Sequence, residues 1–370
     1  MSVLGLANVM NWARGKSLLN HSRENTMQSK KMSGIRRMAK IVSAIGLLGA
    51  VAHMSVAAAS IYDTDAVQAK ALESWHETMR QMPPMTEGCF HATYPSLMWE
   101  KASCGTTSYR STPPVASNAV ATTGDGNDYA AGTAHFTNAA TGSFPVATGV
   151  TSISNNSYTM QLNTNLAGPI VIIGGSSSPA SPVCKKDGYT SCDVWEQFIY
   201  ESGSRNGSGF IQNWMFIPTG SKCLKGWFTY NTSQYNGCYR NSKSVRVPAF
   251  SPTQLANVKL AAAVVKGGND TVTFTNGTNA YAVSEKDAVL GVSYVWNQSE
   301  FNLVGNGGGS QAKFNSGSSL TVNLQVNDGS TNAPSCLANA GTTGETNNLN
   351  LGPCSATGGT SPFIQFTESN

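Results

Sequence analysis

The chain has 370 residues, and only 12% of them are charged, while Gly (37 residues), Ser, Thr and Asn are abundant. This length can bury one large core or two smaller ones without help from a metal, and the composition is not that of an ordinary cytosolic enzyme. The formal net charge of +4 does not indicate a nucleic-acid partner, because the excess positive charge is confined to residues 1–59.

Residues 1–59 contain eight Lys or Arg and one acid, so the rest of the chain is net negative, with 16 Lys or Arg against 19 Asp or Glu. A basic cluster at residues 36–40 precedes an apolar run at 41–51 and small residues that end at Ala59. This order is typical of a secretory signal, and we expect cleavage after Ala59 and a secreted protein, extracellular or periplasmic. A membrane anchor is the alternative, but the run stops at His53, short of the roughly 20 residues that span a bilayer. We expect no stable membrane span after signal removal.

Residues 61–81 form the one convincing helical stretch of the mature chain, because apolar residues recur there at three- and four-residue steps and two prolines follow. We therefore expect three parts: a leader over residues 1–59, an N-terminal helical segment over 60–117 and a β domain over 118–370. The N-terminal segment is either a propeptide or an arm packed on the main domain, and the sequence leaves both open.

All eight cysteines lie beyond the expected cleavage site and fall into four close sequential pairs. An even number at short separations in an exported chain favours local disulfides. Our preferred pairing joins Cys89 with Cys104, Cys184 with Cys192, Cys223 with Cys238, and Cys336 with Cys354. A zinc site is the alternative, but the Cys-x-x-Cys spacing or nearby His residues that it requires are not present.

From residue 128 onward the sequence alternates between short strands and turn residues. The predicted strands are residues 129–136, 142–150, 157–163, 194–200, 210–217, 227–231, 244–248, 258–265, 270–275, 279–284, 291–297, 300–304, 310–314, 320–327 and 363–366. Asn276-Gly277, between two alternating runs, is a strong hairpin signal. So many strands without helices predict an all-β fold, an antiparallel two-sheet jelly-roll or concanavalin-like sandwich with a short helical N-terminal segment.

Several common catalytic devices lack their residues in the main domain. His135 is its single histidine, and no Gly-x-Ser-x-Gly elbow supports a Ser-His-Asp triad. The Gly-rich run at 305–309 does not open a helix, so it predicts a loop rather than a phosphate site. Asp125, Asn127 and Asp128 offer oxygen ligands for one calcium ion, but their spacing favours a turn. We expect no metal and no cofactor.

Two predicted strands place amides and a carboxylate among aromatic rings, given a strand's period of two. One face of residues 292–304 carries Trp296, Gln298, Glu300, Asn302 and Val304, and one face of residues 210–217 carries Phe210, Gln212, Trp214 and Phe216. An isolated buried carboxylate is costly, so the first face indicates the floor of a groove rather than a dry core. We interpret the two faces as neighbours that form one site.

The stretches that carry a family resemblance are residues 129–132, 141–146, 209–212, 299–301 and 312–314. Together they resemble the eqolisins, a family of secreted glutamic peptidases with a lectin-like β-sandwich. The resemblance implies that Gln212 and Glu300 face each other across a groove. The chain departs from the family at Phe301 and Val304, where the family has a Trp and a further acid. It is also similar to a set of exported bacterial proteins with the same Cys and Trp pattern.

The resemblance implies a secreted, acid-acting endopeptidase of the glutamic type. Glu300 would take a proton from water and return it to the departing amine, while the Gln212 amide would stabilise the oxyanion. The residues expected to hold an extended polypeptide substrate are Trp195, Trp214, Trp296, Gln298 and Asn302.

Three alternatives stay open. Rings beside amides also suit a glycan, so the chain could be a lectin-like, carbohydrate-binding module. It could be a structural surface protein, or Gln212 and Glu300 could be ordinary polar residues on the wet face of a sheet. We expect a monomer in each case.

Overall fold

The computed structural model describes residues 57–114, 122–154, 157–168, 179–231 and 236–370, and the side chains of the first helix from Asp65 onward. The expected signal peptide therefore lies outside the described residues. None of the helices in the described ranges is long and apolar enough to cross a membrane.

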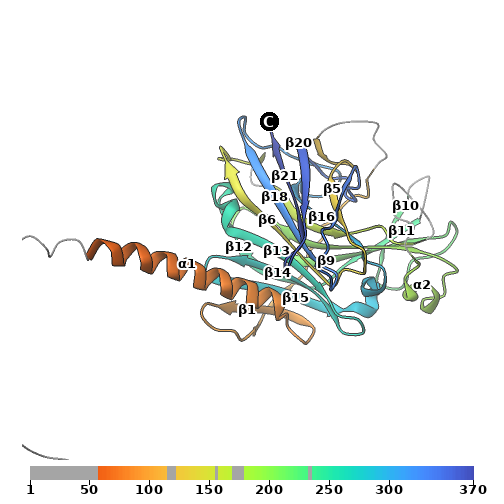
Figure 1. Ribbon diagram of the computed structural model, residues 1–370. Coiled ribbons are helices and arrows are strands. Elements are labelled where there is room, and N and C mark those ends of the chain that lie inside the picture. Colours follow the sequence, from red (N-terminus) through yellow and green to blue (C-terminus); the bar gives the residue numbers. More distant parts are fainter. Residues whose placement is uncertain (1–56, 115–121, 155–156, 169–178, 232–235) are drawn as a thin grey trace, which may run out of the picture. The chain divides into compact units, whose positions relative to one another are not determined.

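The described strands form two sheets (Figure 1). Sheet A has the order β17-β20-β21-β18-β6-β13-β14-β15-β1-β2, with β4 paired to β20. Its strands are β1 (Gly88–Thr93), β2 (Glu100–Ala102), β4 (Thr122–Gly124), β6 (Ala139–Thr148), β13 (Val258–Val264), β14 (Asn269–Asn276), β15 (Asn279–Lys286), β17 (Gln311–Ala312), β18 (Ser319–Asn327), β20 (Thr346–Thr357) and β21 (Phe363–Ser369). Apart from the short parallel pair β17–β20, the described neighbours in this sheet run antiparallel.

Sheet B has the order β10-β11-β9-β8-β7-β16-β5-β19, with β12 paired to both β9 and β3. Its strands are β3 (Cys104–Gly105), β5 (Tyr129–Gly132), β7 (Thr159–Thr164), β8 (Asp193–Glu201), β9 (Asn206–Ile217), β10 (Phe228–Asn231), β11 (Asn236–Asn241), β12 (Ser244–Pro248), β16 (Gln298–Val304) and β19 (Ser335–Ala338). The helices are α1 (Ala57–Gln81), α2 (Pro182–Lys186) and the 3₁₀ turns η2 (Pro252–Asn257), η3 (Asp287–Val289) and η4 (Val292–Tyr294). The predicted all-β class, with two antiparallel sheets and a helical N-terminal segment, is confirmed.

The hydrophobic core lies between the two sheets because the inward-facing positions of the strands are apolar. Along β18, alternate residues from Leu320 to Val326 are buried while their neighbours stay half exposed. Phe301 of sheet B packs on Phe144 of sheet A, with ring centroids 5.0 Å apart. A Cβ at Gly142 would lie 2.1 Å from the Phe301 ring, so the sheets meet closely there.

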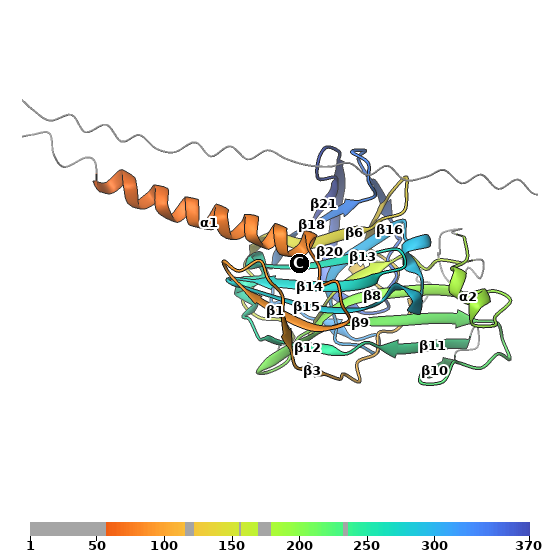
Figure 2. The same cartoon turned by 90° about the horizontal axis from the view of Figure 1, so that it is seen from below.

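The last turns of α1 pack against sheet A beside β13, β14 and β15 (Figure 2). Trp75 and Met79 are buried with residues of β1 and β15. The His76 ring nitrogen Nε2 lies 2.6 Å from the Gly277 carbonyl oxygen in the β14–β15 hairpin. The hairpin predicted at Asn276-Gly277 is present, with Asn276 paired to Asn279 across the turn.

The N-terminal segment contributes strands to both sheets. β1 pairs with β15 in sheet A, and β3 pairs with β12 in sheet B, which Figure 2 shows side by side. The Cys89–Cys104 disulfide joins β1 to β3 and so links the two sheets. This arrangement fixes the chain immediately before residue 106, where it starts to cross the outer face of sheet B.

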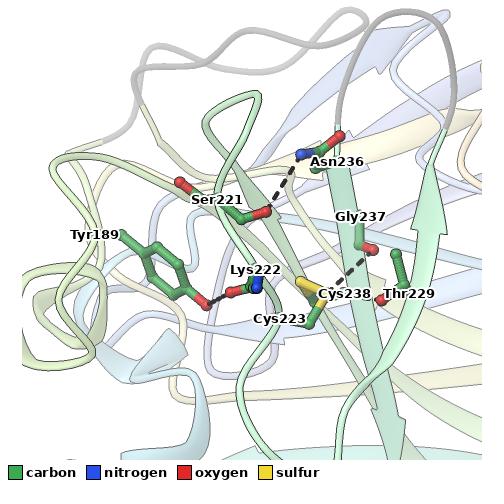
Figure 3. Close-up of a disulfide and its surroundings, with 8 residues drawn as sticks. All are labelled: Tyr189, Ser221, Lys222, Cys223, Thr229, Asn236, Gly237 and Cys238. Carbon is green, nitrogen blue, oxygen red and sulfur yellow. Dashed lines mark hydrogen bonds between the residues drawn. A yellow bond between two sulfur atoms is a disulfide. The ribbon is translucent and has the colours of Figure 1, made fainter.

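All four predicted disulfides are present, joining Cys89–Cys104, Cys184–Cys192, Cys223–Cys238 and Cys336–Cys354. Figure 3 shows how Cys223–Cys238 ties the loop before β10 to β11. Beside it, the Tyr189 hydroxyl donates to the Lys222 carbonyl oxygen (2.7 Å) and Asn236 Nδ2 donates to the Ser221 carbonyl oxygen (3.4 Å). The bridge therefore helps to hold β11, which carries one of the site residues described below. Four disulfides are typical of a chain that folds in an oxidising compartment.

The strand predicted at residues 291–297 is wrong. Gly291 has a left-handed φ of 63° and leads into η4, and Asp287 fixes this turn by accepting from the Ser293 amide (3.2 Å) and hydroxyl (2.9 Å). Trp296 is consequently part of the core, where its ring centroid lies 6.0 Å from that of Phe198, rather than on the face that carries Glu300. The strand begins only at Gln298.

Candidate active site

A row of polar side chains crosses four neighbouring strands of sheet B. Gln212 on β9 lies opposite Gln197 on β8, which lies opposite Asn163 on β7, which lies opposite Glu300 on β16. Residues directly opposite in antiparallel strands share a face, and here it is the face opposite that of Phe301, whose ring packs on Phe144 of sheet A. Gln212 and Glu300 are thus three strand spacings apart, about 14 Å. The structure places them in one row with two amides between them.

Glu300 is an enclosed carboxyl group, 2% exposed, whose two oxygens differ. Its Oε2 accepts from Asn163 Nδ2 (3.1 Å) and from the Thr342 amide (2.7 Å) and hydroxyl (2.6 Å). Its Oε1 has no hydrogen-bond partner within the described residues. Burial raises the pKa of Glu300, and the hydrogen bonds from Thr342 and Asn163 limit the rise. The amide that contacts Glu300 is therefore Asn163.

Gln212 holds a different part of the chain. Its Oε1 accepts from the Ser111 amide and from Trp214 Nε1, each at 2.9 Å. Its Nε2 donates to the Tyr109 carbonyl oxygen (2.9 Å) and to Asn241 Oδ1 (2.6 Å). Both ends of the side-chain amide are thereby engaged, and two of the four partners are backbone groups of residues 109 and 111.

Two stretches of chain cover the polar row. The first, which we call the covering segment, is residues 106–114, and the second is the loop at 339–345 between β19 and β20. They contact each other, because the Gly344 amide donates to the Thr112 carbonyl oxygen (2.6 Å) and the Thr112 amide donates to Glu345 Oε1 (2.8 Å). As a result the row is closed to solvent in this structure.

Three buried carboxyl groups meet at one end of the row. Asn302 Nδ2 donates to Asp128 Oδ2 (3.0 Å) and reaches Glu368 Oε2 (3.5 Å), which also accepts from the Thr123 hydroxyl. Burial raises the pKa of Asp128 well above its usual range, and the charges of Glu300 and Glu368 add to the rise. Burial also raises the pKa of Glu368, to about 7. Neutral carboxyl groups are therefore favoured here over a wider pH range than at a protein surface.

The expected substrate-holding side chains are distributed over both faces of sheet B. Trp195 and Trp214 lie on the same face as the polar row, with ring centroids 6.0 Å apart, but each is 0% exposed. Trp296 is equally buried, in the core, and donates from Nε1 to the Gln298 carbonyl oxygen (2.9 Å). Gln298 is half-buried, and Asn302 belongs to the acid group. None of the three Trp rings presents a face to a sugar in this arrangement.

Several residues of the site were not singled out from the sequence. Asn163 and Gln161 alternate in the strand predicted at 157–163, which was the available signal for an amide-bearing face. Tyr109 and Thr342 gave no signal, because they lie in segments without regular secondary structure. For Asp128 the sequence indicates only a turn residue or a calcium ligand.

No protein-family model matches the chain, and no curated protein matches it. Among solved structures, the chain is similar to the crystal structure of scytalido-glutamic peptidase with a transition state analog inhibitor, at 8% identity and a TM-score of 0.22. The match covers 65% of this chain and 96% of that chain. The likeness is weak.

Proposed function

We propose that the protein is an exported, acid-acting endopeptidase of the glutamic type, in which Glu300 moves the protons. The observation that carries the proposal is the environment of Glu300, an enclosed carboxyl group whose pKa burial raises and whose Oε1 lacks a hydrogen-bond partner within the described residues. It lies at one end of a row of amides whose other end, Gln212, already binds the backbone of residues 109 and 111. A water near Oε1 would be activated by the ionised group, and the proton would later pass to the departing amine.

Two amides take different roles in this proposal. Asn163 Nδ2 donates to Glu300 Oε2 (3.1 Å) and to Gln161 Oε1 (3.3 Å), and exchanging the longer bond for a substrate carbonyl would let it polarise that carbonyl beside the activated water. Gln212 binds the C=O of residue 109 and the N–H of residue 111, so its role is to hold an extended chain in register. In this proposal Gln212 binds the substrate backbone, and Asn163 stabilises the oxyanion.

The test is hydrolysis of an unfolded protein between about pH 3 and 7, since an ordinary Glu titrates near 4.3 and burial raises the pKa of Glu300 above that value. It uses a chain in which Tyr109→Ala and Ser111→Pro weaken the covering segment and, through the bonds of Thr112 to Gly344 and Glu345, its hold on the loop at 339–345 that covers Glu300. Glu300→Gln should abolish cleavage, and Asn163→Ala should lower kcat by about 10²–10³, whereas Gln212→Ala should act chiefly by raising KM.

A matched control is Glu285→Gln. Glu285, on β15, is a buried carboxyl group that accepts from Asn213 Nδ2 (2.5 Å), on the opposite face of β9 from Gln212, and from Arg240 (2.7 Å). Its pKa is also raised by burial. This variant should retain activity. The proposal fails if the opened chain cleaves nothing across this pH range, or if Glu300→Gln and Glu285→Gln lower the rate equally.

A further inference from the structure

The covering segment is held as a peptide ligand is held, through its backbone and by groups from several different elements. Asn241 Nδ2 donates to the carbonyl oxygens of Thr107 (3.1 Å) and Tyr109 (2.8 Å). Gln212 donates to the carbonyl oxygen of residue 109 and accepts from the amide of residue 111. The Gly308 amide donates to the carbonyl oxygen of residue 110 (3.1 Å). In extended peptides bound to proteins, such main-chain hydrogen bonds supply affinity and pockets for alternate side chains supply specificity.

The side chains of the segment alternate as this mode requires. Tyr109 and Ser111 are buried on the sheet, at 6% and 0% exposure, whereas Arg110 between them is half-buried. The Arg110 guanidinium lies over the Tyr230 ring, 4.5 Å from its centroid. Upstream, Thr107 borders an open cavity of about 560 Å³ that Asn241 also lines, so this end of the groove is accessible to an incoming chain.

Tyr109 fills a pocket with an apolar part around its ring and hydrogen-bond donors at its hydroxyl. The ring packs on Phe210, with centroids 5.4 Å apart, and on Ile199. The hydroxyl oxygen accepts from Gln161 Nε2 (2.9 Å) and from the Ser111 hydroxyl (3.1 Å). A phenylalanine would fill the apolar part but would leave the Gln161 amide without this acceptor, and leaving a buried polar group unpaired disfavours the analogue that lacks the hydroxyl.

We infer that the outer face of sheet B is a binding groove for extended polypeptides with a pocket selective for tyrosine, and that residues 106–114 occupy it as an internal ligand that keeps the protein latent. Displacement of this segment opens the groove to a polypeptide in trans. The inference deepens the proposed function, on which its link to hydrolysis rests. The inference that the groove binds polypeptides does not depend on hydrolysis.

The test is the binding of a fluorescein-labelled peptide of residues 106–114, followed by anisotropy at neutral pH so that acid-dependent hydrolysis does not interfere. The wild-type full chain should bind little peptide, because its own segment competes at high local concentration. The chain with Tyr109→Ala and Ser111→Pro should bind it, and amide exchange over residues 107–112 should be faster than in the wild type. Peptides with Phe or Ala in place of the tyrosine are the matched controls.

We expect the Ala peptide to bind roughly 30-fold more weakly than the parent, the loss typical of a buried aromatic anchor, and the Phe peptide about tenfold more weakly. Adding Gln212→Ala to the opened chain should also weaken binding of the parent peptide. The inference is overturned if the segment stays protected from exchange in the opened chain, if the opened chain does not bind the peptide, or if the three peptides bind alike. Binding with this selectivity but without cleavage at any acidic pH would refute the proposed function and leave the groove standing.

Discussion

Burial of carboxyl groups should make this protein more stable in acid than at neutral pH, and Glu368 allows the effect to be measured at one residue. Among the described residues, eight carboxyl groups have a pKa raised by burial, namely Asp128, Glu196, Glu201, Asp270, Glu285, Glu300, Glu345 and Glu368. Within the described part of the chain, the pKa is lowered only for Glu73, to about 2, and for Asp328. Because raised pKa values outnumber lowered ones, protonation of the carboxyl groups favours the folded state over the unfolded state.

The direction and size of the effect follow from proton linkage. The pKa of Glu368 rises from an ordinary 4.5 to about 7 on folding, so between these values the folded state binds a proton that the unfolded state has lost. The free energy of unfolding therefore falls as pH rises through this window and levels off above it. One pKa unit corresponds to about 1.4 kcal/mol, so Glu368 alone should account for about 3 kcal/mol.

Glu368→Gln removes this titration, because an amide stays neutral and resembles the protonated acid in shape. The free energy of unfolding is measured in urea at pH 4.5 and pH 7, with disulfides intact, from the fluorescence of the buried Trp residues. For the wild type it should fall strongly from pH 4.5 to pH 7. The fall should be about 3 kcal/mol smaller for the variant. Glu100→Gln, on the exposed edge strand β2, is the control and should behave as the wild type. A wild-type stability that is constant or rises toward pH 7, or the same fall in Glu368→Gln, would refute the reasoning.

Three further outcomes test the fold. Gly142→Ala should destabilise the protein by about 1–3 kcal/mol in urea unfolding, because the new Cβ would meet the Phe301 ring at 2.1 Å; an unchanged midpoint would mean that the sheets are not in contact there. Leu324→Ala, at a fully buried position, should cost about 2–5 kcal/mol by the same measurement, and a cost below about 0.5 kcal/mol would place Leu324 at the surface. Replacing Cys89 and Cys104 together by Ser should lower stability by about 3 kcal/mol, as expected for a loop of this length, and no change would argue that the bridge does not form.

Local patterns were sufficient to predict most of the fold. The alternation along β18, the hairpin at Asn276-Gly277 and the spacing of the cysteines each depend on residues close in sequence, and each is present in the structure. The error at Trp296 is also local in origin. Gly291 and the Asp287 contacts turn the chain out of the extended conformation there, and a period-two pattern cannot report such a break.

The candidate site depended on information that local patterns do not contain. The alternation of residues correctly predicts that Gln212 and Glu300 lie on strands with polar faces. Their separation is set by the order β9-β8-β7-β16, which inserts Gln197 and Asn163 between them. That order is a result of long-range pairing. The covering segment was equally hidden, because Tyr109 contacts Phe210 and Gln161 from a stretch with no regular pattern of its own.

The most direct test of the central claim is the rate at which the chain with Tyr109→Ala and Ser111→Pro cleaves an unfolded protein with and without Glu300→Gln. The rate is followed across about pH 4–7, from the pKa of an ordinary Glu upward, because burial raises the pKa of Glu300. The account predicts cleavage that inhibitors of Ser, Cys and metal peptidases leave intact, and that disappears when Glu300 is replaced. Cleavage at an equal rate in both chains, or in neither, would contradict it.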